Sequence, residues 1–133
     1  MIVDCWLKKQ SLMNNYKQLD AWKASMELIT EIYLLTKEYP KDELYALTSQ
    51  TKRAAVSIAA NIAEGLGRQY KKDTLQFLHI ARGSLYEVET LLIIATNVQI
   101  INEEKFNQIA IFWQKSIQLL NGFINYYEKA ELK

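Results

Sequence analysis

Apolar residues recur at alternating intervals of three and four along most of this chain, and few residues interrupt the pattern. The strictest run is Thr74, Leu78, Ala81, Leu85, Val88, Leu92 and Ala95. This spacing places all seven side chains on one face of an α-helix, as in a heptad seam. Helix breakers are scarce, because the 133 residues include only one proline and four glycines. The sequence therefore predicts an all-α protein.

Four helices are expected from the periodic segments. The first spans residues 16–38 and is ended by Pro40, because the residue before a proline disfavours helical geometry. The second begins near Asp42, a favourable N-cap residue. It ends at Gly65-Leu66-Gly67, where either glycine can adopt the left-handed conformation of a C-cap.

The third and fourth helices carry the clearest seams. Asp73 or Thr74 is expected to cap the third helix, and Gly83, in its middle, to mark a close contact with another helix. Asn102 is expected to cap the fourth, whose seam is Phe106, Ile109, Trp113, Ser116, Leu120, Phe123 and Tyr127. Short links favour an antiparallel, up-and-down four-helix bundle as a single domain over residues 16–130. Residues 1–15 lack a sustained period and are expected to form a poorly ordered N-terminal extension.

The second helix is apolar around most of its circumference. Besides the apolar stripes that are expected to face the core, this helix carries a further apolar stripe formed by Val56, Ala60 and Ala63. A helix with so little polar surface should contact more than one neighbour. We therefore expect these three residues to form an interface between copies of the chain.

A narrow polar ladder also runs along the second helix, through Arg53, Ser57, Asn61, Glu64 and Arg68. On the third helix, Glu87 shares a face with Ser84 and with apolar residues, so a half-buried Glu87 would need a partner. If the second and third helices are antiparallel, Arg53 and Glu87 lie at similar positions along the axis of the bundle. We expect an Arg53–Glu87 ion pair within a structural polar network of Arg53, Asn61, Glu64, Ser84 and Glu87.

Charge is nearly balanced overall, with 16 basic and 15 acidic residues and a net charge of +1. Residues 41–83 nevertheless hold seven basic and four acidic residues, a net charge of +3. A nucleic-acid interface would use the basic residues of this segment to contact phosphates. Its candidates are Lys52, Arg53, Arg68, Lys71, Lys72 and Arg82, with Tyr70 able to stack on a base.

Catalytic and metal-binding patterns are missing from the sequence. His79 is the only histidine and Cys5 the only cysteine, which excludes the usual metal-ligand clusters and makes a Cys–His nucleophile pair improbable. An enzyme using Glu64, Glu87 or His79 is the weakest hypothesis. We expect no cofactor and no catalysis. No signal peptide and no apolar run of membrane-spanning length is evident, so a cytoplasmic protein without a membrane partner is expected.

Two motifs resemble those of a known family. The run from Thr48 to Ile58 and then Asn61-Ile62-Ala63-Glu64-Gly65 forms the first, and Ile80-Ala81-Arg82-Gly83-Ser84-Leu85 with Glu87 and Glu89 forms the second. Together they resemble the four-helix proteins encoded by 23S rRNA intervening sequences, over residues 16–128. The resemblance implies a ring, typically a homopentamer. It also implies kinship with the accessory variability determinant of diversity-generating retroelements, which binds nucleic acid and a reverse transcriptase.

Two functions are compatible with these observations. The first is a non-enzymatic homo-oligomer that associates with RNA or DNA through its basic segment, with a reverse-transcriptase-like protein as a further partner. The alternative is a structural adaptor ring that binds a protein partner without nucleic acid.

Overall fold

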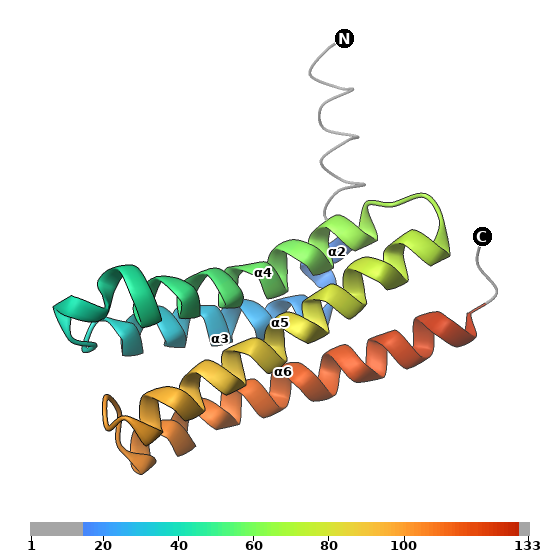
Figure 1. Ribbon diagram of the computed structural model, residues 1–133. Coiled ribbons are helices and arrows are strands. Elements are labelled where there is room, and N and C mark those ends of the chain that lie inside the picture. Colours follow the sequence, from blue (N-terminus) through green and yellow to red (C-terminus); the bar gives the residue numbers. More distant parts are fainter. Residues whose placement is uncertain (1–14, 131–133) are drawn as a thin grey trace, which may run out of the picture.

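The computed structural model describes residues 15–130, and its elements are helical throughout (Figure 1). The long helices of this range are α3 (Asp20–Thr36), α4 (Ser49–Leu66), α5 (Lys71–Asn97) and α6 (Glu103–Lys129), and a short helix, α2 (Asn15–Gln18), precedes them. Between residues 15 and 130 there is no strand, which confirms the all-α class. The extension expected at residues 1–15 lies outside the described residues, apart from Asn15.

The long helices enclose one core. α4 packs against α3 and α5, and α6 packs against the same two helices on the other side. Figure 1 shows α4 and α5 side by side, with the link between them and the end of α6 at the same end of the molecule. α4 and α5 run in opposite directions, because Thr74 contacts Gly65 next to the link and Ser84 contacts Ser57 well away from it.

The seams expected for the last two helices face this core. All seven residues of the α5 seam, from Thr74 to Ala95, are buried. In α6, the four central seam residues from Ile109 to Leu120 are buried, and the three outer ones are partly buried. The Trp113 indole N–H donates to the carbonyl of Leu85 at 2.6 Å, which joins the two helices inside the core.

Several helix ends differ from expectation. The first helix is interrupted at Leu19 and stops at Thr36. The second begins with a 3-10 turn, η1 (Lys41–Glu43), and a π-helical turn, η2 (Leu44–Thr48), so Asp42 is not its N-cap. Instead, the Glu43 carboxylate accepts from the backbone N–H of Leu47 at 3.3 Å. Glu43 is therefore the N-cap of η2, because its carboxylate satisfies a backbone N–H of the first turn.

The glycine expectations are also corrected. Gly67 follows α4 with a φ of −86°, and no glycine of the described residues has a positive φ, so the left-handed cap is wrong. The third helix starts at Lys71, ahead of the predicted caps, and Thr74 instead donates its hydroxyl to the Gly65 carbonyl at 2.7 Å. Gly83 faces open space, so the close contact expected there is absent. The expected N-cap of the fourth helix is confirmed, because Asn102 Oδ1 accepts from the Lys105 backbone N–H at 2.8 Å.

Across the described residues, no helix combines the length and the apolar character needed to span a lipid bilayer.

Candidate functional site

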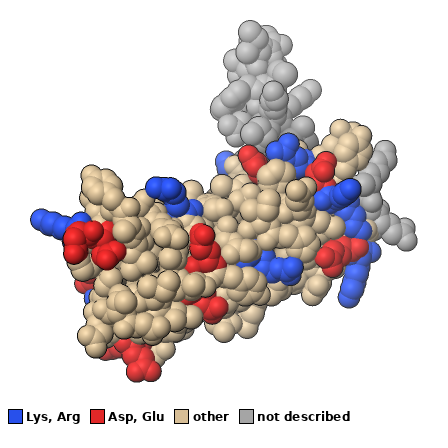
Figure 2. Space-filling view, in the orientation of Figure 1, with Lys and Arg blue, Asp and Glu red and all other residues tan. Residues whose placement is uncertain are grey.

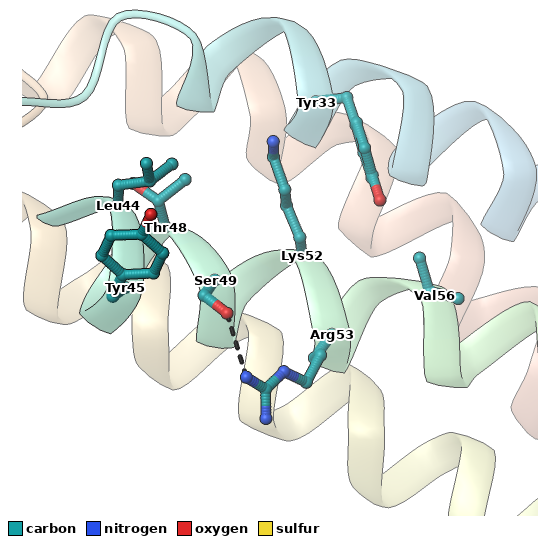
Figure 3. A pocket seen from close by; sticks show the side chains of 8 residues that line it. All are labelled: Tyr33, Leu44, Tyr45, Thr48, Ser49, Lys52, Arg53 and Val56. Atoms are coloured by element: carbon teal, nitrogen blue, oxygen red, sulfur yellow. Dashed lines mark hydrogen bonds between the residues drawn. The ribbon is translucent and has the colours of Figure 1, made fainter. Parts of the chain in front are cut away.

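An open pocket of about 470 Å³ lies where η2 and the first turns of α4 meet α3; we call it the α4 pocket (Figure 3). Tyr33 reaches it from α3, and the other residues follow one another along η2 and α4. Its lining consists of Tyr33, Leu44, Tyr45, Thr48, Ser49, Lys52, Arg53 and Val56. The π-helical turn changes the local pitch, and such turns are frequent at functional sites.

The α4 pocket is positively charged and partly aromatic. The Lys52 ammonium lies over the Tyr33 ring, 4.8 Å from its centroid, and the Arg53 guanidinium donates to Ser49 Oγ at 3.1 Å. None of the eight lining residues is acidic. The Tyr45 side chain is 92% exposed at the rim. Tyr45 is not among the predicted site residues, because helical periodicity does not show the direction of a side chain in an irregular turn.

Arg53 also borders a neighbouring hollow, which it shares with Glu87. The expected Arg53–Glu87 ion pair is not formed, since no pairing between them occurs among the ion pairs of residues 15–130. Two observations explain the difference: Arg53 bonds to Ser49 one turn earlier in its own helix, and Glu87 is exposed to water rather than half-buried. An exposed carboxylate does not need a partner.

The other members of the expected polar network separate into two groups. Ser57 Oγ and Ser84 Oγ lie 2.9 Å apart, and the Asn61 amide donates to Ser57 Oγ at 2.9 Å and to the Ser57 carbonyl at 2.8 Å. Glu64 is directed elsewhere and faces Arg68 at 4.0 Å. The α4–α5 contact therefore contains a hydroxyl–amide cluster centred on Ser57 instead of an ionic network.

The basic link between α4 and α5 is only partly available to a ligand. Lys71 Nζ donates to the carbonyls of Glu128 and Ala130, at 2.5 and 2.9 Å, and so binds the end of α6. The Arg68 guanidinium lies over the Phe77 ring, 4.6 Å from the centroid. Tyr70 and Lys72 are exposed.

Arg82 lies in a third place, on the α5–α6 side. It donates to Asn121 Oδ1 at 3.3 Å and lies 2.9 Å from His79 Nδ1, and His79 Nε2 faces Glu128 at 3.7 Å. The seven candidate nucleic-acid residues thus occupy three places. Those on α4 and those in the link are separated by about 24 Å at 1.5 Å per helical residue.

Figure 2 shows how charge is distributed over the face formed by α4 and α5. Most of this face is uncharged, and basic and acidic side chains are interspersed on it, more densely at the end with the α4–α5 link. The three residues expected at an interface lie on the outer side of α4: Val56 is 44% exposed, Ala60 is exposed and Ala63 is half-buried. Packing within the chain therefore leaves this stripe partly open to water.

Groups of three or more potential metal-ligating side chains do not occur in the described part of the chain. The described acids and His79 are dispersed, and the ionisable side chain with a resolved pKa shift is Tyr39, which lies away from the α4 pocket.

The order of the helices and the two motifs at the α4–α5 contact define a known class of helical proteins. The chain belongs to the family of 23S rRNA-intervening sequence proteins, which residues 17–122 match. It is also similar to a crystal structure from Bacteroides thetaiotaomicron VPI-5482, described as a protein of unknown function from the S23 ribosomal protein family. The two share 26% sequence identity with a TM-score of 0.72, over 78% of this chain and 97% of that one. No functionally curated protein matches the sequence.

Proposed function

We propose that this protein is a non-enzymatic homo-oligomer, in which antiparallel four-helix bundles assemble into a ring, and that the assembly associates with RNA or DNA. The proposed assembly is supported by the partly exposed apolar stripe of α4, which consists of Val56, Ala60 and Ala63. On the neighbouring helix, Met26 and Tyr33 are each 40% exposed. Apolar surface of this kind marks a protein–protein contact. A ring of about five copies agrees with the family resemblance of the two motifs.

A mass measurement in solution tests the assembly. We expect light scattering after gel filtration to give several times the chain mass of 15.5 kDa at micromolar concentration. Ala60→Glu should reduce that mass to one chain, because a carboxylate buried at an apolar interface lacks a partner. Gln114→Glu, at an exposed polar position of α6, adds the same charge and should leave the mass unchanged. A wild-type monomer would contradict the proposal.

The nucleic-acid role is supported by the exposed Tyr70 and Lys72, by Lys52 and Arg53, and by the relatives' names, which refer to 23S rRNA and to a ribosomal protein. Binding through lysine and arginine should weaken steeply as salt rises, because phosphate contacts release counterions. Fluorescence anisotropy with a single-stranded RNA and a DNA of the same sequence tests this. Lys72→Gln should lower the affinity and reduce the salt slope. Absence of binding at low salt would disprove this part.

The adaptor ring is the second candidate. Its support is the largely uncharged face of α4 and α5 together with the net charge of +1. Co-purification that recovers a protein partner with the wild-type oligomer, but no nucleic acid, would favour it over the first proposal.

A further inference from the structure

We propose that the α4 pocket binds a single nucleotide, with its phosphate held by Lys52 and its base stacked on Tyr45. This deepens the nucleic-acid part of the proposed function at one of its residues, Lys52, and it does not require that copies of the chain assemble. It adds a ligand class and a recognition residue that neither the motifs nor the family description assigns.

The charge of the pocket selects an anion. Lys52 and Arg53 are adjacent in sequence, and their neighbours in the pocket are hydroxyl and apolar side chains without a carboxylate. The contacts of Lys52 and Arg53 are a ring face and a serine hydroxyl, which leave their charges uncompensated. Glu87 borders the adjacent hollow, on the side of Arg53, and does not line the α4 pocket. Lys52 is therefore the phosphate ligand of the pocket.

The remaining surface of the pocket selects a flat apolar group attached to that anion. Tyr45 is 92% exposed, and Leu44 and Val56 add apolar walls, of which Val56 also belongs to the stripe proposed for assembly. A base gains stacking energy on an exposed aromatic ring whatever its identity. Figure 3 shows Lys52 extending from α4 towards α3 and Arg53 extending the opposite way, with Tyr45 at the η2 end of the pocket. One ligand bearing a base and a phosphate can therefore contact both ends of the pocket.

The size of the pocket suits a ligand of about one nucleotide. Its volume of about 470 Å³ lies within the range of small-molecule sites, roughly 300–1,000 Å³. A stacked duplex does not expose a base for a single ring to cover. The nucleotide can come from solution or from the end of a single strand, and both sources present the same chemistry.

Isothermal titration of the full chain with AMP, adenosine and inorganic phosphate tests this inference. We expect saturable AMP binding, at least about tenfold tighter than adenosine or phosphate, which corresponds to about 1.4 kcal/mol. Tyr45→Ala and Lys52→Gln should each weaken AMP binding about tenfold. Tyr126→Ala and Lys129→Gln, which replace an exposed tyrosine and an exposed lysine of α6, are the matched controls and should leave it unchanged.

Three results would overturn the inference. If AMP fails to bind at millimolar concentration, the pocket is not a nucleotide site. If adenosine binds as tightly as AMP, the basic side chain does not hold the phosphate. A Tyr45→Ala variant that lowers the oligomer mass but binds AMP normally makes Tyr45 a contact between copies. A 5′-phosphorylated oligonucleotide is compared with AMP in the same titration. If it binds more tightly than AMP and its affinity falls after dephosphorylation, the nucleotide that the pocket binds is the end of a strand.

The two proposals fail separately in these experiments. If RNA or DNA binds in the anisotropy experiment but AMP does not bind, only the proposal of a nucleotide pocket is disproved. If AMP binds but RNA and DNA do not, only the proposed nucleic-acid function is disproved.

Discussion

Individual residues show where close packing, rather than periodicity, fixes the identity of a side chain. A Cβ atom added at Gly65 would lie 2.9 Å from Phe77 Cβ and 3.1 Å from the Thr74 carbonyl oxygen. Gly65 therefore allows the end of α4 to approach the start of α5. At Gly83, by contrast, an added Cβ meets no atom within 4 Å.

These two glycines should respond to alanine in opposite directions. Gly65→Ala is expected to lower the free energy of unfolding by about 1–3 kcal/mol, because the backbone and Phe77 must move apart. Gly83→Ala should raise it by about 0.5–1 kcal/mol, since alanine favours the helix and nothing obstructs it. Urea denaturation of both variants measures the difference. Equal effects would show that α4 and α5 are not in close contact at Gly65.

Tyr39 is a second residue whose surroundings matter more than its place in the pattern. Its ring packs with Ala95 and Ile101 in a small satellite core, and its hydroxyl has no hydrogen-bond partner among the described residues. Burial raises the pKa of the Tyr39 hydroxyl from 10.0 to about 12. Ionisation of Tyr39 therefore favours the unfolded chain.

Tyr39→Phe should be neutral or stabilising at pH 7, because it removes a buried polar group that has no partner. The neutral Tyr39 hydroxyl makes its full contribution to the stability of the wild type below pH 10. This contribution is lost as the pH rises from 10 towards 12, because the pKa of Tyr39 is higher in the folded state than in the unfolded chain. The stability of the variant relative to wild type should therefore increase over that range. Chemical denaturation at pH 7, 9 and 11 tests this, and a constant difference would contradict it.

At the scale of elements, the ends of helices depend on partners far away in the sequence. The start of α5 and the end of α6 are joined by Lys71, whose ammonium binds two carbonyls beyond the reach of the helical ladder. A cation at a helix C-terminus also interacts favourably with the helix dipole. Lys71 thus takes a structural role, although its neighbour Lys72 remains exposed.

Replacing Lys71 should loosen the last turn of α6 without unfolding the protein. Lys71→Met is expected to speed amide hydrogen exchange at residues 126–130, with a loss of global stability of about 1 kcal/mol or less. Lys72→Met is the matched control and should leave exchange there unchanged. The assignment of Lys71 to the end of α6 is wrong if the two variants behave alike.

At the scale of the whole molecule, the core is complete but the surface retains apolar residues. The buried seams of α3, α4, α5 and α6 form one cluster, whereas Val56, Ile111 and Tyr126 remain open to water. A protein with a full core and a partly apolar surface can gain further stability by association. Binding of copies to the folded state raises apparent stability with concentration.

Thermal unfolding should therefore depend on protein concentration. We expect the apparent Tm of the wild type to rise by several degrees over a hundredfold increase in concentration, because only the folded chain assembles. Ala60→Glu should remove this dependence, and Gln114→Glu should keep it. A wild-type Tm that is independent of concentration would argue against assembly.

Local periodicity was sufficient to predict the approximate extent of the long helices and the buried faces of α5 and α6. Periodicity is a local property, and a side chain on the apolar stripe of a helix such as α5 is buried in any fold that covers that stripe. The seam from Thr74 to Ala95 and the N-cap at Asn102 were therefore predictable. In α3, Leu28 and Ile32 are buried, whereas Met26 and Tyr33, which also recur at helical spacing, are 40% exposed.

Which polar groups contact one another depends on how the helices pack, and periodicity does not predict it. Arg53 bonds to Ser49 instead of Glu87, Lys71 reaches the end of α6, and Tyr45 stands at the rim of a pocket. Hydrogen bonds and ion pairs depend on separations of a few tenths of an ångström, and several partners lie within reach of each long side chain. The relative height and rotation of packed helices set those separations, and periodicity alone fixes neither.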